Sequence, residues 1–210
     1  MATSCDDCPS FLSVSPSNPC KNVLGKIGRI FFQKAVTSNN WIDGTNDLSA
    51  ADSWAGLTAS GDATHVTVTD VLLAVEKSDA NYVTGSQNID GADTINGVSA
   101  QEFTLTWQNP TPAQVQAMEN IKCSDDGTLG VLLVDKNGKM QANVITDTPQ
   151  TYSFIPVSIG TFVVGTPVND GAFGSQDVLT IKFSLAYDWY QESEVVIPEA
   201  GFNPYNDITG

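Results

Sequence analysis

Residues 129–146, LGVLLVDKNGKMQANVIT, are the stretch that decides the fold. Two runs rich in Val, Leu and Ile flank Asn137-Gly138, the dipeptide preferred in two-residue type I′ turns of β-hairpins. The sequence therefore predicts a hairpin formed by residues 129–136 and 139–146. A two-residue turn would place Leu133 opposite Ala142. The buried face would then hold five apolar residues, Val131, Leu133, Met140, Ala142 and Val144.

Alternating apolar and polar residues predict two long strands on either side of this hairpin. In residues 102–108, Phe103, Leu105 and Trp107 face one way and polar side chains face the other. The run from Leu179 to Tyr187 alternates in the same manner. Each run predicts a strand with one face in the core.

Two further segments are expected to be strands of a different kind. Residues 26–35 carry apolar side chains on both faces, which is typical of a strand covered on both sides. Val66 and Val68 begin another run, whose alternation slips at Asp70 and resumes at Val71. The slip predicts a bulge or a bend in the chain.

One helix is expected at about residues 112–123. Thr111-Pro112-Ala113-Gln114 forms a capping box with proline at the first helical position, and apolar residues then recur at helical spacing. The expected fold is therefore mainly β, a β-sandwich or barrel-like domain with one short flanking helix.

The chain divides into three expected parts. Residues 1–25 form an N-terminal arm that contains cysteines, residues 26–197 form the sandwich domain, and residues 198–210 form a C-terminal arm. Within the domain, residues 38–62 and 78–100 have no regular pattern and are expected to be long loops. Loops of this length are usually functional or disordered.

The composition restricts the possible partners. The 210 residues include 24 acids and 9 bases, which gives a formal net charge of −15. A chain this acidic is a poor candidate for holding nucleic acid by neutralising phosphates, although DNA could pass it without being held. No run approaches the roughly 18 apolar residues of a membrane span, and the first ten residues do not resemble a signal peptide. We therefore expect no membrane partner and synthesis in the cytoplasm.

The sequence contains no recognisable catalytic or cofactor motif. His65, the single histidine, lies on the polar face of an expected strand, and no nucleophile motif accompanies it. We therefore expect no enzyme activity, no cofactor and no bound metal. Four cysteines are weak candidates for a zinc site, with disulfides or unpaired thiols as the alternatives. They are Cys5, Cys8, Cys20 and Cys123.

Two sets of residues are candidates for contacts between subunits. Bases gather near the N-terminus, whereas residues 43–102 hold ten acids and one base. Aromatic residues lie in or beside the expected loops and the tail, where they either form contacts or fold back onto the domain. The basic candidates are Lys21, Lys26, Arg29 and Lys34. The aromatic candidates are Trp41, Trp54, Tyr82, Trp189, Tyr190, Phe202 and Tyr205.

Together these features resemble the tail tube (major tail) proteins of long-tailed bacteriophages. The resemblance rests on the order of elements: a short capped helix, a hairpin of the LGVLLVDKNGK type and a late alternating strand that ends in Tyr187-Asp188-Trp189. The Cys5-Asp-Asp-Cys8 start is similar to that of structural proteins from phages and prophages of the Bacteroidetes lineage.

The resemblance implies a function and a set of partners. Proteins of this family are β-sandwiches with a flanking helix that assemble as stacked hexameric rings around a DNA channel. Many use a long hairpin to line the channel and grip the next ring, and residues 38–62 or 78–100 would take that place here. The implied partners are further copies of the chain and other virion tail proteins, in a virion tail assembled in the host cytoplasm, with an acidic lumen.

Two other classes of protein remain open at this point. A capsid decoration or head–tail joining protein would have the same composition. A carbohydrate-binding or adhesin module would also be a β-sandwich with aromatic-bearing loops.

Overall fold

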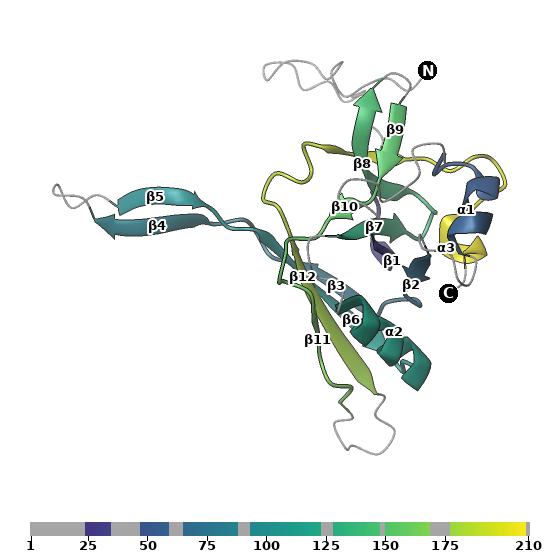
Figure 1. Cartoon of the computed structure of the whole chain (residues 1–210), viewed down its shortest axis with the longest axis horizontal. Coiled ribbons are helices and arrows are strands. Elements are labelled where there is room, and N and C mark those ends of the chain that lie inside the picture. Colours follow the sequence, from purple (N-terminus) through teal and green to yellow (C-terminus); the bar gives the residue numbers. More distant parts are fainter. Residues whose placement is uncertain are drawn as a thin grey trace.

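The computed structural model describes residues 24–34, 47–58, 65–87, 93–122, 128–147, 150–168 and 177–208. Within these ranges the protein is mainly β, with three antiparallel sheets and three short helices (Figure 1). The predicted fold class is therefore confirmed. Of the four cysteines, none lies within the described residues, and the same holds for Lys21 and Trp41.

The larger sheet has seven strands and the order β13-β8-β7-β1-β2, with β10 beside β7 and β9 beside β8. Its central strand β7 is buried along its whole length, with β1 on one side and β8 followed by β10 on the other. The strands are β1 (Ile27–Lys34), β2 (Val66–Val68), β7 (Leu129–Asp135), β8 (Met140–Asp147), β9 (Gln150–Ser153), β10 (Ile155–Pro156) and β13 (Ser193–Val196).

The second sheet has four strands in the order β11-β12-β6-β3, and the third is the pair β4-β5. The two predicted alternating strands, β6 and β12, are neighbours over eight residue pairs, from Gln108 opposite Val178 to Gln101 opposite Leu185. The strands are β3 (Ala74–Lys77), β4 (Tyr82–Gln87), β5 (Asp93–Val98), β6 (Gln101–Gln108), β11 (Val163–Val164) and β12 (Val178–Leu185).

The main core lies between these two larger sheets. Phe103 stacks on Phe183 with ring centroids 5.3 Å apart, and Phe32 meets Phe183 edge to face at 5.9 Å. The predicted inward faces of β6 and β12 are confirmed, since Phe103, Leu105 and Trp107 and the facing residues of β12 are all buried. Tyr187 lies beyond the end of β12 and is exposed.

A second core covers the other face of the larger sheet. Phe31 points into this core whereas Ile30 and Phe32 point into the main one, which confirms that β1 is covered on both sides. The cover consists largely of α1 (Ala51–Leu57) and the C-terminal segment with α3 (Pro204–Asp207). The expectation of a single helix is wrong, because the second face of the sheet needs a cover and these two segments provide it.

Helix α2 (Pro112–Lys122) forms where the capping box predicts it. The Thr111 backbone N–H donates to Gln114 Oε1 at 2.8 Å, and the Gln114 N–H donates to Thr111 Oγ1 at 3.3 Å. These two bonds satisfy donors that the first helical turn leaves free. Met118 anchors the helix in the main core.

The turn between β7 and β8 differs from the prediction. Leu133 pairs with Gln141, not Ala142, so the loop has three residues, 136–138. Gly138 has φ +81° whereas Asn137 has no positive φ, and a type I′ turn needs both. The buried Asp135 carboxylate selects the longer loop, because its Oδ1 accepts from the backbone N–H groups of Asn137 and Lys139.

The shift of one residue changes which side chains share a face. Met140 and Ala142 lie in the second core with Leu132 and Val134, whereas Val131 and Leu133 lie in the main core. The predicted single buried face of this hairpin is therefore wrong.

The slip at Asp70 marks the point where the chain crosses between sheets. β2 belongs to the larger sheet and β3 to the second, and residues 69–73 connect them. The Leu72 N–H still donates to Gly28 O at 2.8 Å, whereas the Leu73 N–H already donates to Thr106 O at 2.9 Å. The predicted bend is confirmed.

Candidate functional site

The most distinctive feature of the molecule is a long two-stranded ribbon. β3 and β6 pair in one register, from Ala74 opposite Thr106 to Lys77 opposite Phe103, and β4 and β5 continue it with Tyr82 opposite Val98. Residues 74–87 and 93–108 are therefore two sides of one ribbon. We call its outer described part, residues 78–87 and 93–100, the arm.

The arm lies outside the two larger sheets, and it projects from the domain in Figure 1. Its nine described residues 79–87 span about 30 Å at ~3.3 Å per residue. Hydrogen bonds from Ser78 and Ser99 hold its base: Ser78 Oγ accepts from the Glu102 N–H, and Ser99 Oγ from the Asn81 N–H. Residues 78–100 were expected to be a loop without regular structure, and that expectation is wrong.

The arm makes no described contribution to either core. Among its described side chains, Tyr82 is 71% exposed and Val83 is 47% exposed. A two-stranded hairpin on its own is marginally stable in water. An exposed aromatic on such a ribbon is typical of a contact surface.

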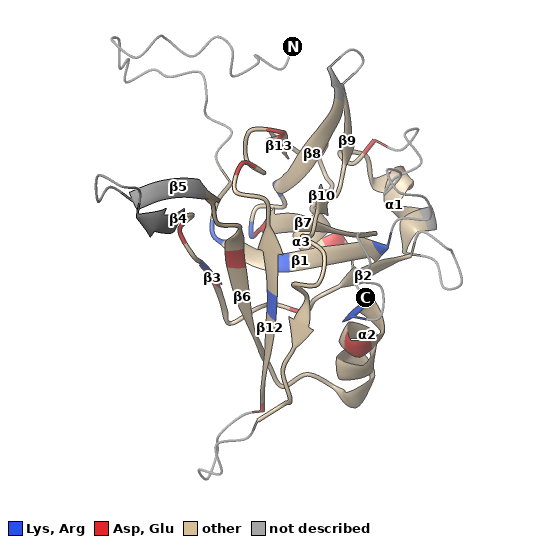
Figure 2. Ribbon diagram, turned by 60° about the vertical axis from the view of Figure 1, so that its left-hand side comes forward, with Lys and Arg blue, Asp and Glu red and all other residues tan. Residues whose placement is uncertain are grey.

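The three described N-terminal bases, Lys26, Arg29 and Lys34, do not form one patch. Lys26 and Lys34 are exposed, beside and at opposite ends of β1, and basic positions are scattered over separate elements (Figure 2). Arg29 is occupied within the domain: its Nη1 donates to Ile208 O at 2.8 Å, its Nη2 lies 3.9 Å from Asp70 Oδ1, and its guanidinium lies 5.1 Å from the centre of the Tyr205 ring.

The aromatic candidates separate into buried and exposed groups. Trp54 is 3% exposed and belongs to the second core, and Trp189 packs on the main core while its Nε1–H donates to Gln101 Oε1 at 2.8 Å. Phe202 and Tyr205 pack on the second core. Tyr82 and Tyr190 are exposed. The other four described aromatic candidates therefore pack on their own domain, which is the second of the two expected alternatives.

The C-terminal segment is correspondingly part of the domain and not a free arm. Pro204 and Ile208 are buried, and Tyr205 lies so close to Gly28 that a Cβ there would come within 2.7 Å of the tyrosine ring. Glycine at position 28 therefore permits this packing.

We expect Ile208→Ala to lower the free energy of unfolding by about 2 kcal/mol, because it removes a buried side chain from the second core. Asn206→Ala, an exposed position on the same short helix, is the control and should change it by less than about 0.5 kcal/mol. Urea unfolding of both variants measures the difference. Equal stabilities would show that the segment does not hold the second core together.

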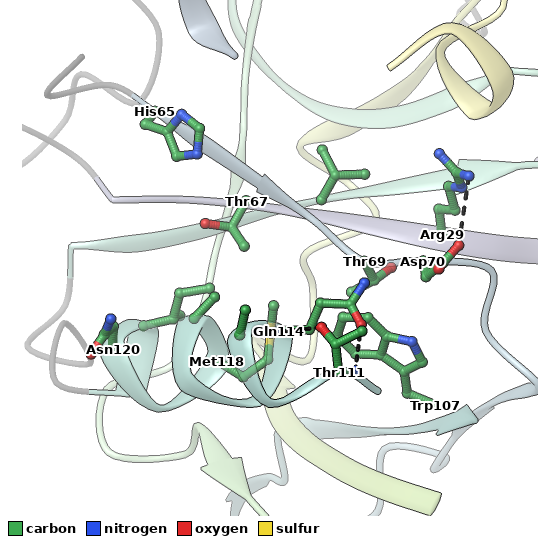
Figure 3. Close-up of a pocket in the computed structure, with 14 residues that line it drawn as sticks. Arg29, His65, Thr67, Thr69, Asp70, Trp107, Thr111, Gln114, Met118 and Asn120 are labelled. Atoms are coloured by element: carbon green, nitrogen blue, oxygen red, sulfur yellow. Dashed lines mark hydrogen bonds and ion pairs between the residues drawn. The ribbon is translucent and has the colours of Figure 1, made fainter. Parts of the chain in front are cut away.

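A groove between β2 and α2 is the second candidate surface, and the sequence analysis does not predict it. It has a volume of about 760 Å³. Polar side chains from both walls reach it, among them His65, Thr67 and Gln114 (Figure 3). Ala113 and Ala117 line the helical wall. The groove joins segments far apart in the sequence, and so no local motif could have revealed it.

The groove gathers few groups that could act in chemistry or bind a metal among the described residues. His65 is its one imidazole, and no group of three or more metal-ligating side chains occurs in the described part of the chain. Trp107 lines the floor but is only 1% exposed, so its ring offers no stacking face. The zinc candidates Cys5, Cys8, Cys20 and Cys123 lie outside the described residues.

No family model, curated protein or solved structure matches this chain. Among the described residues, no helix is both long and apolar enough to cross a bilayer. The site must therefore be interpreted from its own geometry.

Proposed function

We propose that this protein is a structural virion protein, a tail tube subunit of a long-tailed bacteriophage that forms stacked rings around a DNA channel. The observation that carries the proposal is the arm. The family that the sequence resembles combines a β-sandwich and a flanking helix with a long hairpin, which lines the channel and grips the next ring. A ribbon that leaves the sandwich and exposes Tyr82 has the form this role requires.

The charge distribution supports the same role. In the sequence, residues 78–100 hold three acids, Asp79, Asp90 and Asp93, and no Lys or Arg, and the whole chain carries −15. DNA can slide along a wall of like charge without being held at any one point, because phosphate neutralisation is the main source of non-specific affinity. An acidic lumen follows from this arrangement. The subunit number of six comes from the family resemblance.

The groove gives little support to the carbohydrate-binding alternative. The aromatic residue in this groove, Trp107, is buried, so the groove presents no aromatic face on which a sugar could stack. The alternative of a decoration or head–tail joining protein shares the prediction of self-assembly, but no described contact favours it over a tube subunit.

The test is the particle formed by the purified chain. We expect light scattering and negative-stain electron microscopy to show rings or stacked tubes with a central channel. Each copy carries −15, so like-charge repulsion opposes assembly, and the measurement should run from low to moderate salt, which screens that repulsion. Monodisperse monomers at high concentration across this range would reject the proposal. A small closed oligomer that binds a glycan array would favour the binding-module alternative.

A further inference from the structure

The groove has one wall made of an open sheet edge. β2 is the last strand of the larger sheet, and no described strand lies on its outer side. The Thr69 N–H donates to Ile30 O at 3.0 Å. The backbone N–H and C=O groups of successive residues in an antiparallel strand point alternately toward and away from the neighbouring strand. Because those of Thr69 point toward β1, those of Val66 and Val68 point away from it. This edge can accept another strand by β-augmentation.

The size of the groove fits a short extended segment. With ~3.3 Å between residues, ~4.8 Å between strands and ~10 Å between layers, one strand residue occupies about 160 Å³. A groove of about 760 Å³ is therefore large enough to admit a short extended segment. The opposite wall allows the backbone of a bound segment to approach α2 closely, because the helix presents the small side chains of Ala113 and Ala117 there.

The electrostatics of the groove favour a neutral backbone over an ionic ligand. Its one guanidinium, on Arg29, lies 3.9 Å from its one carboxylate, on Asp70. The hydrogen-bonding groups that remain are mainly those of hydroxyl and amide side chains and of the strand edge. Main-chain hydrogen bonds would then supply most of the affinity.

The arm is a suitable occupant. β4 and β5 form a sheet of their own, so each has a free edge, and β4 begins with the exposed Tyr82 and Val83. β4 has six residues and is itself a short extended segment. The arm extends away from the side of the domain where β2 and α2 lie (Figure 1). The arm therefore points away from the groove of its own copy.

We propose that the groove between β2 and α2 receives the arm of a second copy of this chain, which adds a strand to β2. The proposal rests on the proposed function and names the contact that joins the subunits. Arm and groove are different surfaces, so the contact is heterologous, and each copy can donate one arm and accept another. Repetition of such a contact builds a ring or a filament.

The test fills the groove of the full-length chain. Ala117→Trp places a large side chain in it, and Ala113→Trp does so from an exposed position where folding is not at risk. Gln116→Trp puts the same side chain on α2 at an exposed position that does not line the groove, and serves as the control. We expect both groove variants to raise the concentration for half-assembly at least tenfold, and the control to assemble like the wild type.

A mixing experiment identifies the two halves of the contact. A chain without the arm keeps its groove, and the Ala117→Trp chain keeps its arm. Each alone should remain monomeric in sedimentation, but a mixture should form pairs that grow no further. A mixture that remains monomeric would overturn the proposal.

The outcomes separate this proposal from the proposed function. Folded groove variants that assemble like the wild type would overturn the groove contact and leave the tube subunit standing. Wild-type chains that form no rings or tubes, while the mixture still forms pairs, would reject the tube and keep the contact. A wild-type chain that remains monomeric at every concentration would overturn both.

Discussion

Removing the arm is expected to abolish assembly while the domain remains folded. The Ser78 N–H donates to Glu102 O at 2.8 Å, so residues 80–100 can be replaced by Asn-Gly, and Asp79-Asn-Gly-Gln101 then closes the ribbon as a four-residue loop. No described arm residue belongs to either core. We therefore expect the free energy of unfolding to change by less than about 1 kcal/mol, the range of surface changes. Sedimentation of the shortened chain should show monomers where the wild type forms particles.

A point variant tests the arm without changing the length of the chain. Tyr82→Ser removes an aromatic ring that is 71% exposed, and Ile159→Ser removes an equally exposed apolar side chain elsewhere in the domain. Aromatic anchors contribute about 2 kcal/mol or more to an interface, so Tyr82→Ser should weaken assembly by tenfold or more. Equal effects of the two substitutions would show that the arm has no special part in assembly.

Trp54→Ala is expected to have the largest effect on stability, a loss of about 4 kcal/mol in the free energy of unfolding. Trp54 is 3% exposed, its ring meets Phe31 edge to face at 5.5 Å, and its Nε1–H donates to Leu48 O at 3.0 Å. Replacement by alanine leaves a cavity beneath α1. Urea denaturation with an unchanged m-value measures the loss.

Two further variants identify the source of that effect. Trp54→Phe keeps a ring but leaves the buried Leu48 carbonyl without its donor, and should cost about 1–2 kcal/mol. Asp52→Ala, an exposed position in the first turn of α1, should cost less than about 1 kcal/mol. If Trp54→Ala instead reduced assembly and left unfolding unchanged, Trp54 would be an interface residue.

Parts of the fold with a simple period were predicted correctly from the sequence. β6 and β12 alternate because one face of each packs in the main core, and β1 is apolar on both faces because a core lies on each side. The capping box marks the start of α2 because its two hydrogen bonds are local. In each case the residues that fix the structure lie close together along the chain.

The incorrect predictions occur where residues distant in the sequence determine the local structure. Asn137-Gly138 is compatible with a two-residue or a three-residue loop, and the Asp135 carboxylate, which also accepts from the distant Gly25 N–H, accompanies the longer one. α1 has only seven residues, too few to show a helical period in the sequence, and so Trp54 falls in an expected loop. Two features of the sequence do point to this helix. Trp54 and Leu57 are three residues apart, and the two apolar faces of β1 require a cover on each side.

The candidate surfaces were harder to predict than the core. The arm packs on nothing described, so no apolar face distinguishes β4 and β5 in the sequence. The groove combines residues of β2 with residues of α2, more than forty positions later in the chain. Only the folded chain brings these two walls together.

The continuous ribbon also determines how the protein would carry a mechanical load. Tension applied to the arm along its axis passes into β6, which pairs with β12 over eight residue pairs. The inter-strand hydrogen bonds of an antiparallel pair run perpendicular to the strands, so such a pull shears them together and does not open them one after another. Force is then shared along the whole ladder. A subunit pulled along its arm is therefore expected to resist more strongly than one whose strands are pulled apart sideways.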